Sequence, residues 1–306
     1  MPRLTRAFVL TVLLALSAPL GAQAALDTVQ IRAIALARNV YMLTGSGGNI
    51  GLAVGDDAVF VVDDQFAPLT TRILAAIATI TSKPVRFVVN THWHFDHTGG
   101  NENMGKAGGL IVAHENVRSR MSSEQFIEAL NRREPASPAG ALPVVTFTDG
   151  MTFHINGDSL VVTHMPHAHT DGDAIVHFTR ANVVHTGDTF VSAGLPFVDL
   201  SSGGSIHGVI AVAERVYAMS NDQTKIIPGH GPATDRARVK AFREMLVVLR
   251  DRMSVQVAAG RTLDEVLAAR ITADFATEWP NGHDRFVRLL YQEMATRKAA
   301  ARAAAP

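Results

Sequence analysis

Residues 91–101 read THWHFDHTGGN and carry three histidines and one aspartate within six positions. The apolar run VRFVV comes just before them, which predicts a buried strand that ends at this cluster. Residues two apart on an extended chain face the same side, so His92 and His94 can bind one metal ion. Asp96 and His97 lie further into the loop and point elsewhere, which indicates a second ion. Imidazole and carboxylate groups are ligands of zinc, so the stretch predicts a metal site.

Two local ligands are too few for a zinc ion, so other parts of the chain must complete the site. Three segments are candidates because each carries histidine or aspartate directly after an apolar run: HMPHAHTDGD (164–173), HTGD (185–188) and PGHGP (228–232). Strand ends that meet at one edge of a sheet sandwich would bring these segments to the first cluster. Spacing alone does not decide between His164, His167 and His169 as the ligand in the first segment.

The rest of the chain shows strand-like and helix-like patterns. Apolar runs bounded by turn residues predict strands, and apolar residues at helical spacing predict helices. The expected strands are 39–45, 49–55, 58–64, 85–92, 109–115, 144–149, 151–157, 159–165, 174–180 and 181–187. The expected helices are 68–81, a short one from 115, 207–220, 233–260, 262–270 and 283–300. Residues 122–142 show no strong period and predict a loop with a short helix.

The segment HWHFDH resembles the HxHxDH signature of the metallo-β-lactamase superfamily, and the later segments follow in that family's order. The resemblance covers residues 39–235. It implies an α/β (α+β) fold, an αββα sandwich of two mixed β-sheets with helices on the outer faces, which agrees with the order of the predicted elements. We therefore expect one hydrolase domain at 25–306, with C-terminal helices at 233–300.

The same resemblance implies two zinc ions, and iron or manganese would also suit ligands of this kind. The implied ligands are His92, His94 and His169 for one ion, Asp96, His97 and His230 for the other, and Asp188 as a bridge. Asp96 would also orient a hydroxide held between the ions, which attacks the substrate. Asp63 is expected to support the metal loop and His185 to support a neighbouring ligand. The family pattern favours His169, which leaves His164 and His167 as supporting groups.

The bridging position separates branches of the superfamily. Secreted β-lactamases often have cysteine where this chain has Asp188, whereas the glyoxalase II and lactonase branches use aspartate, as here. We expect cleavage of a carbonyl bond in a β-lactam, lactone or ester. A glyoxalase II-like thioesterase and a single-iron redox enzyme similar to persulfide dioxygenases are the alternatives. Trp93 and Phe190 are the aromatic candidates for the wall of an apolar substrate cleft.

The first 24 residues differ in character from those that follow. Two arginines precede an apolar stretch that ends in AQA, which is typical of a secretory signal peptide cut after Ala24. The 306 residues include no cysteine, which excludes disulfides and thiolate ligands. Basic and acidic residues balance at 28 each, so no basic field favours nucleic acid. We expect a periplasmic or secreted protein that acts on a small molecule, without a membrane partner after cleavage; its oligomeric state stays open.

Overall fold

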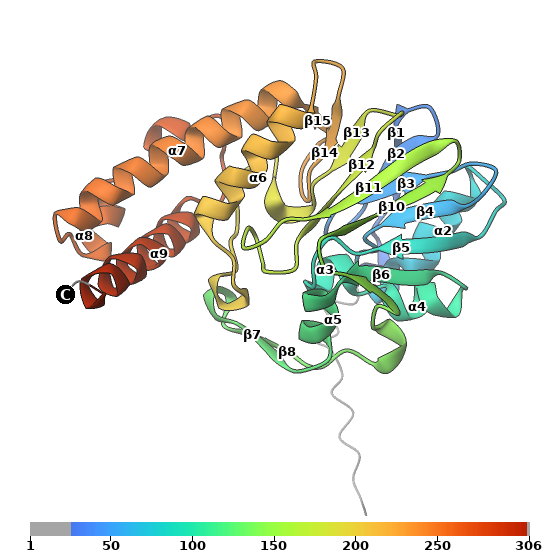
Figure 1. Ribbon diagram of the computed structural model, residues 1–306, viewed down its shortest axis with the longest axis horizontal. Coiled ribbons are helices and arrows are strands. Elements are labelled where there is room, and N and C mark those ends of the chain that lie inside the picture. Colours follow the sequence, from blue (N-terminus) through green and yellow to red (C-terminus); the bar gives the residue numbers. More distant parts are fainter. Residues whose placement is uncertain (1–25, 305–306) are drawn as a thin grey trace, which may run out of the picture.

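The computed structural model describes residues 26–304, and the predicted signal peptide at 1–24 lies outside them. Two β-sheets pack face to face with helices on their outer sides (Figure 1). In spatial order, the first sheet contains β1 (Arg32–Ala37), β2 (Val40–Thr44), β3 (Ile50–Ala53), β4 (Val59–Val62), β5 (Val85–Val89), β6 (Leu110–His114) and β9 (Val145–Phe147). The second contains β10 (Gly150–Ile155), β11 (Asp158–His164), β12 (Ala174–Phe178), β13 (Val183–His185), β14 (Lys225–Ile227) and β15 (Thr234–Asp235).

The helices fall into two sets along the chain. The first set accompanies the first sheet and comprises α2 (Thr70–Ala78), α3 (Phe95–Thr98), α4 (Asn101–Lys106) and α5 (Glu115–Met121). The second set follows the second sheet and comprises α6 (Ile206–Met219), α7 (Arg236–Ala258), α8 (Leu263–Ala268) and α9 (His283–Ala303). A separate hairpin of β7 (Gln125–Ile127) and β8 (Arg132–Glu134) lies below the sandwich in Figure 1.

Strand β4 shows why the two sheets pack. Its four residues, VFVV, are fully buried and alternate between two apolar clusters. Phe60 faces the second sheet, where its ring meets that of Phe178 edge-on with 6.4 Å between the centroids. Val61 points the other way and packs in a cluster with Ile73 of α2. Full burial of such side chains contributes about 1.5–3 kcal/mol each, so a strand apolar on both faces favours a place inside a layered fold.

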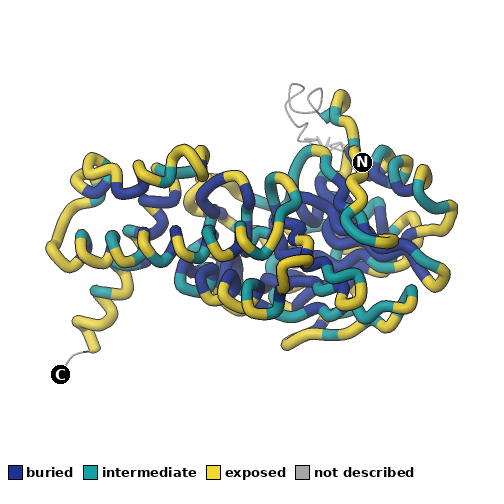
Figure 2. Tube along the Cα trace, turned by 90° about the horizontal axis from the view of Figure 1, so that it is seen from above, coloured by how far each residue is buried: buried dark blue, intermediate teal, exposed yellow. Residues whose placement is uncertain are grey.

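The C-terminal helices extend the molecule to one side of the sandwich (Figure 1). In Figure 2 the buried segments run through the sheets and along the sides of these helices that face one another. Phe242 of α7 and Trp279 before α9 are fully buried there. Glu293 of α9 accepts hydrogen bonds from Ser205 Oγ at 2.6 Å and Ile206 N at 2.8 Å, at the start of α6. This carboxylate therefore fixes α9 to the helix that covers the second sheet.

The segments that carry the candidate ligands leave their strands at one end of the sandwich. β5 runs parallel to β4 and β6, and β13 runs parallel to β14, so the carboxyl ends of neighbouring strands lie together. Two backbone hydrogen bonds join the sheets at this end. Asn49 N donates to Gly229 O and Ala174 N donates to Thr91 O, each at 2.7 Å.

The predicted αββα sandwich is confirmed, and several details differ from the sequence analysis, among them the short helices α3 and α4, which were not predicted. Strand β1 was not predicted and adds to the edge of the first sheet. The β7–β8 hairpin occupies residues expected to be a loop with a short helix. The helix expected at 233–260 begins three residues later, because the side chain of Asp235 caps it by accepting a hydrogen bond from Arg238 N. Among the described residues, no helix combines the length and apolar character that a membrane span requires.

Candidate metal centre

The seven candidate ligands meet at the end of the sandwich where the two sheets are joined. Their side-chain nitrogen and oxygen atoms form three groups, and within each group the atoms lie within 4.8 Å of one another. The groups are His92, His94 and His169; His92, His97 and Asp188; and Asp96, His97 and His230. The loop after β5 and helix α3 supply four of these residues from the first sheet. The other three come from the second sheet, so the site is shared between the sheets.

The Asp188 carboxylate lies between two sets of ring nitrogens. Its Oδ1 is 3.2 Å from His97 Nε2, and its Oδ2 is 3.3 Å from His230 Nε2 and 3.7 Å from His169 Nε2. His94 Nδ1 and His169 Nε2 are 2.9 Å apart on one side. His97 Nε2 and His230 Nε2 are 3.4 Å apart on the other. Ligand atoms around a tetrahedral zinc ion lie about 3.3 Å apart, so the arrangement fits one ion on each side of this carboxylate.

Two ligand atoms, His92 Nε2 and Asp188 Oδ1, are buried without a hydrogen-bond partner in the described part of the protein. Nε2 of His92 makes no hydrogen bond, although an unsatisfied buried polar atom costs about 1–3 kcal/mol. The other ring nitrogen, Nδ1, lies 3.0 Å from Thr91 Oγ1, whose own proton is donated to Asp63 Oδ2. His92 Nδ1 therefore carries the ring proton, and Nε2 presents its lone pair to the centre. The donor set and this unpartnered nitrogen both fit a bound metal ion.

Three further ligand rings are held through their outer nitrogens. His97 Nδ1 donates to Asp63 Oδ2 at 2.8 Å, His94 Nε2 donates to Asp199 Oδ2 at 3.1 Å, and His169 Nδ1 donates to Phe197 O at 2.8 Å. Because the outer nitrogen carries the proton, the inner nitrogen keeps the lone pair that a metal requires. Asp63 thus orients His97 directly and His92 through Thr91.

Burial and neighbouring charges set the protonation states of the ligands. Burial, reinforced by His97, holds the pKa of His92 well below its usual range, and burial lowers the pKa of His169 to about 4. Both rings are therefore neutral at pH 7. Burial would raise the pKa of Asp96, but His97 and His230 outweigh it and lower that pKa to about 2. Burial would lower the pKa of His97, but Asp188 and Asp96 outweigh it and hold that pKa well above its usual range, and Asp188 raises the pKa of His230 to about 10. These two rings are protonated when no cation is bound, and a metal ion would take the place of the proton on the inner nitrogen.

Two glycines let loops close on the ligands. A Cβ atom on Gly48 would overlap the ring of His97, and one on Gly229 would overlap the Asp188 carboxylate. The side chain of Asn49 holds these loops together, because its amide donates at 2.9 and 2.8 Å to two carbonyl oxygens of PGHGP. The glycine-rich character of both segments therefore follows from their close approach to the site.

His185 lies behind the ligands and uses both of its ring nitrogens. Nε2 donates to Asn49 O at 3.1 Å, and Nδ1 accepts a hydrogen bond from Gly187 N at 3.2 Å. The ring joins the two sheets and leaves no nitrogen for a metal ion.

His164 and His167 lie outside the three ligand groups found in the described chain. The His164 ring stacks on that of His114 with 3.7 Å between centroids, and its Nε2 donates to a backbone carbonyl at 3.0 Å. His167 Nδ1 donates to Gly203 O at 3.1 Å. The structure therefore brings His169, and neither of its two neighbours, to the candidate metal centre.

The two aromatic residues expected at the substrate wall do not line the cleft, and that prediction is corrected. Trp93 lies between two ligands in the sequence, so its side chain points away from them into a small core with Val117 and Met121. Phe190 is 1 % exposed and packs edge-on against Phe242 of α7 at 5.0 Å.

Two aspartates that support the ligands were missed by the sequence analysis. Asp199 holds His94, from 105 positions further along the chain. Asp173 accepts hydrogen bonds from the backbone nitrogens of His169 and Thr170 at 2.6 and 2.9 Å, and burial raises its pKa to about 8. The TDGD sequence around Asp173 offered a turn signal, whereas nothing local marks Asp199.

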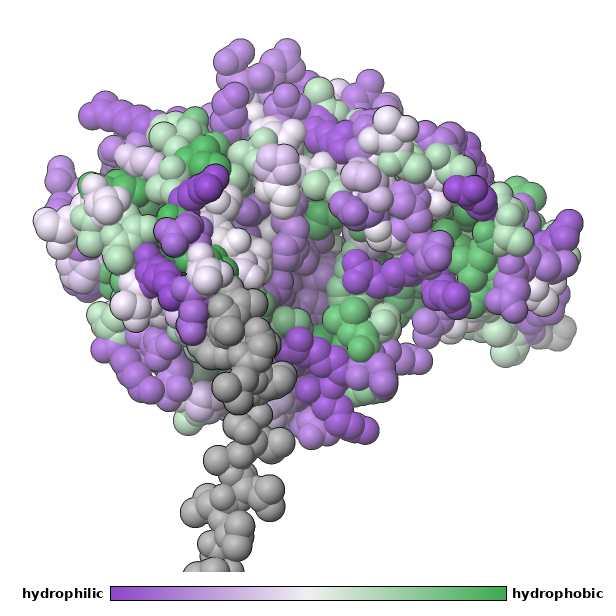
Figure 3. Space-filling view, turned by 180° about the vertical axis from the view of Figure 1, so that it is seen from behind, coloured by the Kyte–Doolittle hydropathy of each residue, from purple (hydrophilic) through white to green (hydrophobic). Residues whose placement is uncertain are grey.

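A cleft of about 420 Å³ opens directly onto the ligands. Asp96, Asp188 and His230 form part of its floor, and the walls come from Phe95, the hairpin, the segment after Asp188 and the start of α9. Apolar side chains dominate these walls: Ile127, Leu130, Val191, Leu195 and Phe197. In Figure 3 the face seen from behind is hollowed beside the C-terminal helices, with polar surface deep in the hollow and apolar surface on its lower rim.

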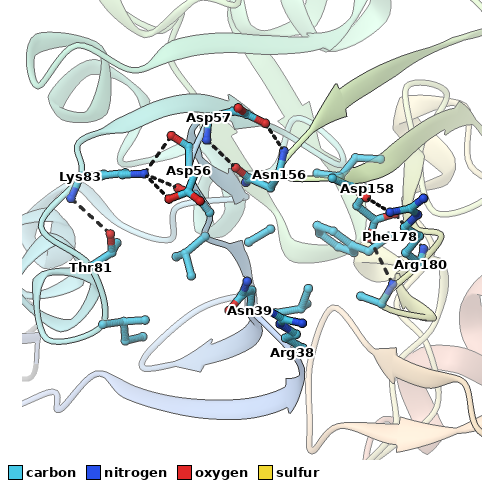
Figure 4. A pocket seen from close by; sticks show the side chains of 18 residues that line it. Arg38, Asn39, Asp56, Asp57, Thr81, Lys83, Asn156, Asp158, Phe178 and Arg180 are labelled. Carbon is cyan, nitrogen blue, oxygen red and sulfur yellow. Dashed lines mark hydrogen bonds and ion pairs between the residues drawn. The ribbon is translucent and has the colours of Figure 1, made fainter.

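A larger cavity of about 780 Å³ lies at the opposite end of the sandwich (Figure 4). Its carboxylates are paired with a lysine or with backbone nitrogens. Lys83 Nζ pairs with Asp56 Oδ1 at 3.0 Å, and Asp57 Oδ2 accepts a hydrogen bond from Asn156 N at 2.6 Å. Asp158 accepts hydrogen bonds from three backbone nitrogens. None of these residues belongs to a metal-ligand group within residues 26–304.

Several known proteins are similar to this chain in sequence. A beta-lactamase-like protein 2 homolog of Caenorhabditis elegans is 22 % identical over 71 % of this chain and 70 % of its own length. The acyl-coenzyme A thioesterase MBLAC2 of Bos taurus is 22 % identical over 63 % of this chain and 72 % of its own. A hydroxyacylglutathione hydrolase of Gloeobacter violaceus is 28 % identical over 46 % of this chain and 52 % of its own.

Solved structures agree at the level of the fold. A metallo-beta-lactamase from Pontibacter korlensis superposes with a TM-score of 0.57 at 20 % identity, over 71 % of this chain and 99 % of its own. The sec-alkylsulfatase Pisa1 from a Pseudomonas species superposes with a TM-score of 0.62 at 16 % identity, over 86 % of this chain and 50 % of its own. The family model described as the metallo-beta-lactamase superfamily matches residues 43–235, which include all seven candidate ligands. The chain belongs to the metallo-β-lactamase superfamily.

Proposed function

We propose that this protein is a dinuclear zinc hydrolase that cleaves the carbonyl bond of a compact acyl compound. The observation that carries the proposal is the Asp188 carboxylate, which lies within 3.7 Å of ring nitrogens from three histidines that belong to two separate ligand groups. A carboxylate in that position can serve two ions at once. The unpartnered Nε2 of His92 gives independent support.

Two zinc ions would supply a nucleophile at neutral pH and polarise the substrate carbonyl. The chain's own residues orient the reaction around them. Asp96 is ionised, is 18 % exposed and forms part of the cleft floor, so it can accept a proton from the attacking water and pass it to the leaving group. His94 is held by Asp199, which keeps its ring in a fixed orientation during that transfer. The apolar walls exclude water from the acyl group.

The apolar cleft favours an uncharged scissile bond over a phosphodiester, because its walls offer few groups that stabilise a phosphate. β-Lactams, lactones and esters remain the leading classes. Thioesters are the second candidate, since two relatives are named as an acyl-coenzyme A thioesterase and a hydroxyacylglutathione hydrolase. We also propose that the protein acts in the periplasm or is secreted after removal of residues 1–24; N-terminal sequencing of protein from the native host tests this.

Metal analysis of the purified protein tests the proposal first. We expect about two zinc ions per chain, and hydrolysis of at least one β-lactam, lactone, ester or thioester that is lost with a chelator and restored by zinc. The Asp96→Asn variant should keep the ion of the His92, His94 and His169 group and lose about 100-fold or more in kcat, because it removes the proton acceptor and one candidate ligand of the second ion.

A single bound iron, together with oxygen consumption in the presence of a persulfide substrate, would contradict the proposal and favour a redox enzyme. A protein with two zinc ions that hydrolyses none of the four classes would also contradict it, because the centre would then lack the proposed acyl substrate.

A further inference from the structure

Apart from the candidate ligands, Arg285 is the one basic side chain among the described residues that line the metal cleft. It lies in the first turn of α9, in a part of the chain beyond the 43–235 region that the family model matches. Most other residues of the wall are apolar, and Asn281 is the other polar side chain there apart from the candidate ligands. The Asn281 amide is used within the protein, since it donates to Ala193 O at 3.1 Å.

The guanidinium of Arg285 has no ion-pair or hydrogen-bond partner within residues 26–304. It lies over the ring of Phe197, with 5.1 Å between its central carbon and the ring centroid. The Phe197 ring is stacked on the ring of His94 with 6.0 Å between centroids, and the Phe197 carbonyl accepts the proton of His169. One residue thus connects this free positive charge to two candidate ligands.

The stability of α9 does not explain an arginine at this position. The first turn of a helix carries partial positive charge, so a cation there is unfavourable and acidic residues are preferred. The residue before the helix is Gly282, with a φ of 86° and no capping side chain, so the backbone N–H groups add to the positive potential. Asp284 is the acidic residue that suits this first turn, so the helix itself gives no reason for the cation at Arg285.

We propose that Arg285 binds a carboxylate of the substrate at the cleft rim and makes the site selective for acyl compounds that carry such a group. This inference rests on the proposed function, because it names the substrate class of the same site. Arginine suits the role, since its planar guanidinium can bind both oxygens of a carboxylate. The cleft of about 420 Å³ lies within the usual size range of small-molecule sites, and Asp96 and Asp188 line it together with Arg285.

The test compares two esters that differ in one charge. Mono-4-nitrophenyl glutarate carries a free carboxylate, and 4-nitrophenyl methyl glutarate carries a methyl ester in its place. We expect the zinc-loaded wild-type protein to prefer the first ester. The Arg285→Ala variant should lose about 10- to 100-fold in kcat/KM for the first ester, mainly through KM, and change little for the second. Arg285→Lys should retain part of the preference.

Arg288 provides the matched control, because it is exposed on the same helix one turn further on and does not line the cleft. The Arg288→Ala variant should behave as wild type on both esters. Equal losses on the two esters in Arg285→Ala, or no loss on either, would overturn the proposal. The same follows if Arg288→Ala reproduces the effect, because the charge of the helix and not the cleft residue would then be responsible.

A binding measurement separates this inference from the proposed function. If the wild-type protein hydrolyses neither ester, the hydrolase proposal is contradicted for this class, and calorimetric titration with monomethyl glutarate then decides the role of Arg285. Metal-free wild-type protein should bind this carboxylate about 10-fold or more tightly than metal-free Arg285→Ala. The assignment would be overturned if the two proteins bound monomethyl glutarate equally tightly. It would also be overturned if the wild-type protein bound dimethyl glutarate as tightly as monomethyl glutarate.

Discussion

The two ends of the sandwich hold two cavities that differ in how their polar groups are satisfied. The cavity at the far end is the larger, about 780 against 420 Å³, and its carboxylates are already bound by Lys83, Asn156 or backbone nitrogens. At the metal end, buried His92 Nε2 has no partner, and ionised Asp96 and Asp188 face histidines across gaps of 3.2–3.7 Å. Incomplete satisfaction of buried polar atoms, more than cavity size, distinguishes the end that can bind a ligand.

The largest effect should come from a carboxylate at the metal end. Asp188→Ala removes the group between the two sets of ligands, so we expect loss of at least one metal ion and a fall in kcat/KM of about 1,000-fold or more. Metal analysis and the hydrolysis assay measure both effects. Asp57→Ala at the far end is the control and should leave metal content and activity unchanged. A similar loss in both variants would remove the functional contrast between the two ends.

Metal removal should destabilise the wild-type protein. Variants at the two ends of the sandwich should differ in how much stability they lose when the metal is removed. A ligand present at 1,000 times its dissociation constant contributes about 4 kcal/mol to the free energy of unfolding. Chelation should lower that free energy by a similar amount in the wild type and in Asp57→Ala, as measured by urea denaturation. Asp188→Ala should show a much smaller drop. If chelation left the unfolding curve of the wild type unchanged, the idea that a bound metal ion holds the two sheets together would be wrong.

A supporting aspartate should have an intermediate effect. Asp199→Ala removes the acceptor that orients His94, so metal affinity should fall about 10- to 100-fold, as measured with a competing chelator. The matched variant Asp158→Ala removes a carboxylate that also accepts several hydrogen bonds, at the far end. It should cost about 1–2 kcal/mol of stability and leave metal affinity intact. Equal affinity losses would mean that general destabilisation explains both.

The smallest effect concerns acid stability at the far end. Burial would raise the pKa of Asp158, but hydrogen bonds from Arg180 N and Ala181 N outweigh it and lower the pKa below its usual range. The ionised form is thus favoured in the folded state, so its contribution is present above pH 4 and is lost as the pH falls through the lowered pKa. Metal-free Asp158→Asn should therefore lose slightly less stability than metal-free wild type between pH 4 and pH 2. Parallel denaturation curves would contradict this assignment.

The sandwich and the position of its ligand-bearing end were predictable because the signals are local. The VRFVV run ends next to four candidate ligands, three histidines and one aspartate, and the later segments repeat that pattern after other apolar runs. Strand β1 and the β7–β8 hairpin carried no such signal. β1 is an edge strand with mostly exposed residues, and the hairpin strands have three residues each, which is too short for a period to appear.

Side-chain direction and long-range contacts explain the remaining errors. Trp93 was expected in the cleft because it adjoins His92 and His94, yet neighbouring residues on an extended chain point to opposite sides. Asp199 reaches His94 only because the loop after β13 folds back across the site. Arg285 reaches the same cleft from the last helix of the chain. Sequence spacing carries no information about such contacts, which arise only when the layers have packed.

The division of the ligands between the two sheets has a consequence for how the protein folds. The loop after β5 holds His92, His94, Asp96 and His97, whereas the other three candidate ligands follow strands of the second half. Neither half alone carries all seven candidate ligands. Tight metal uptake during refolding should therefore report the moment at which the two sheets dock, and a zinc-sensitive dye would follow that late step in real time.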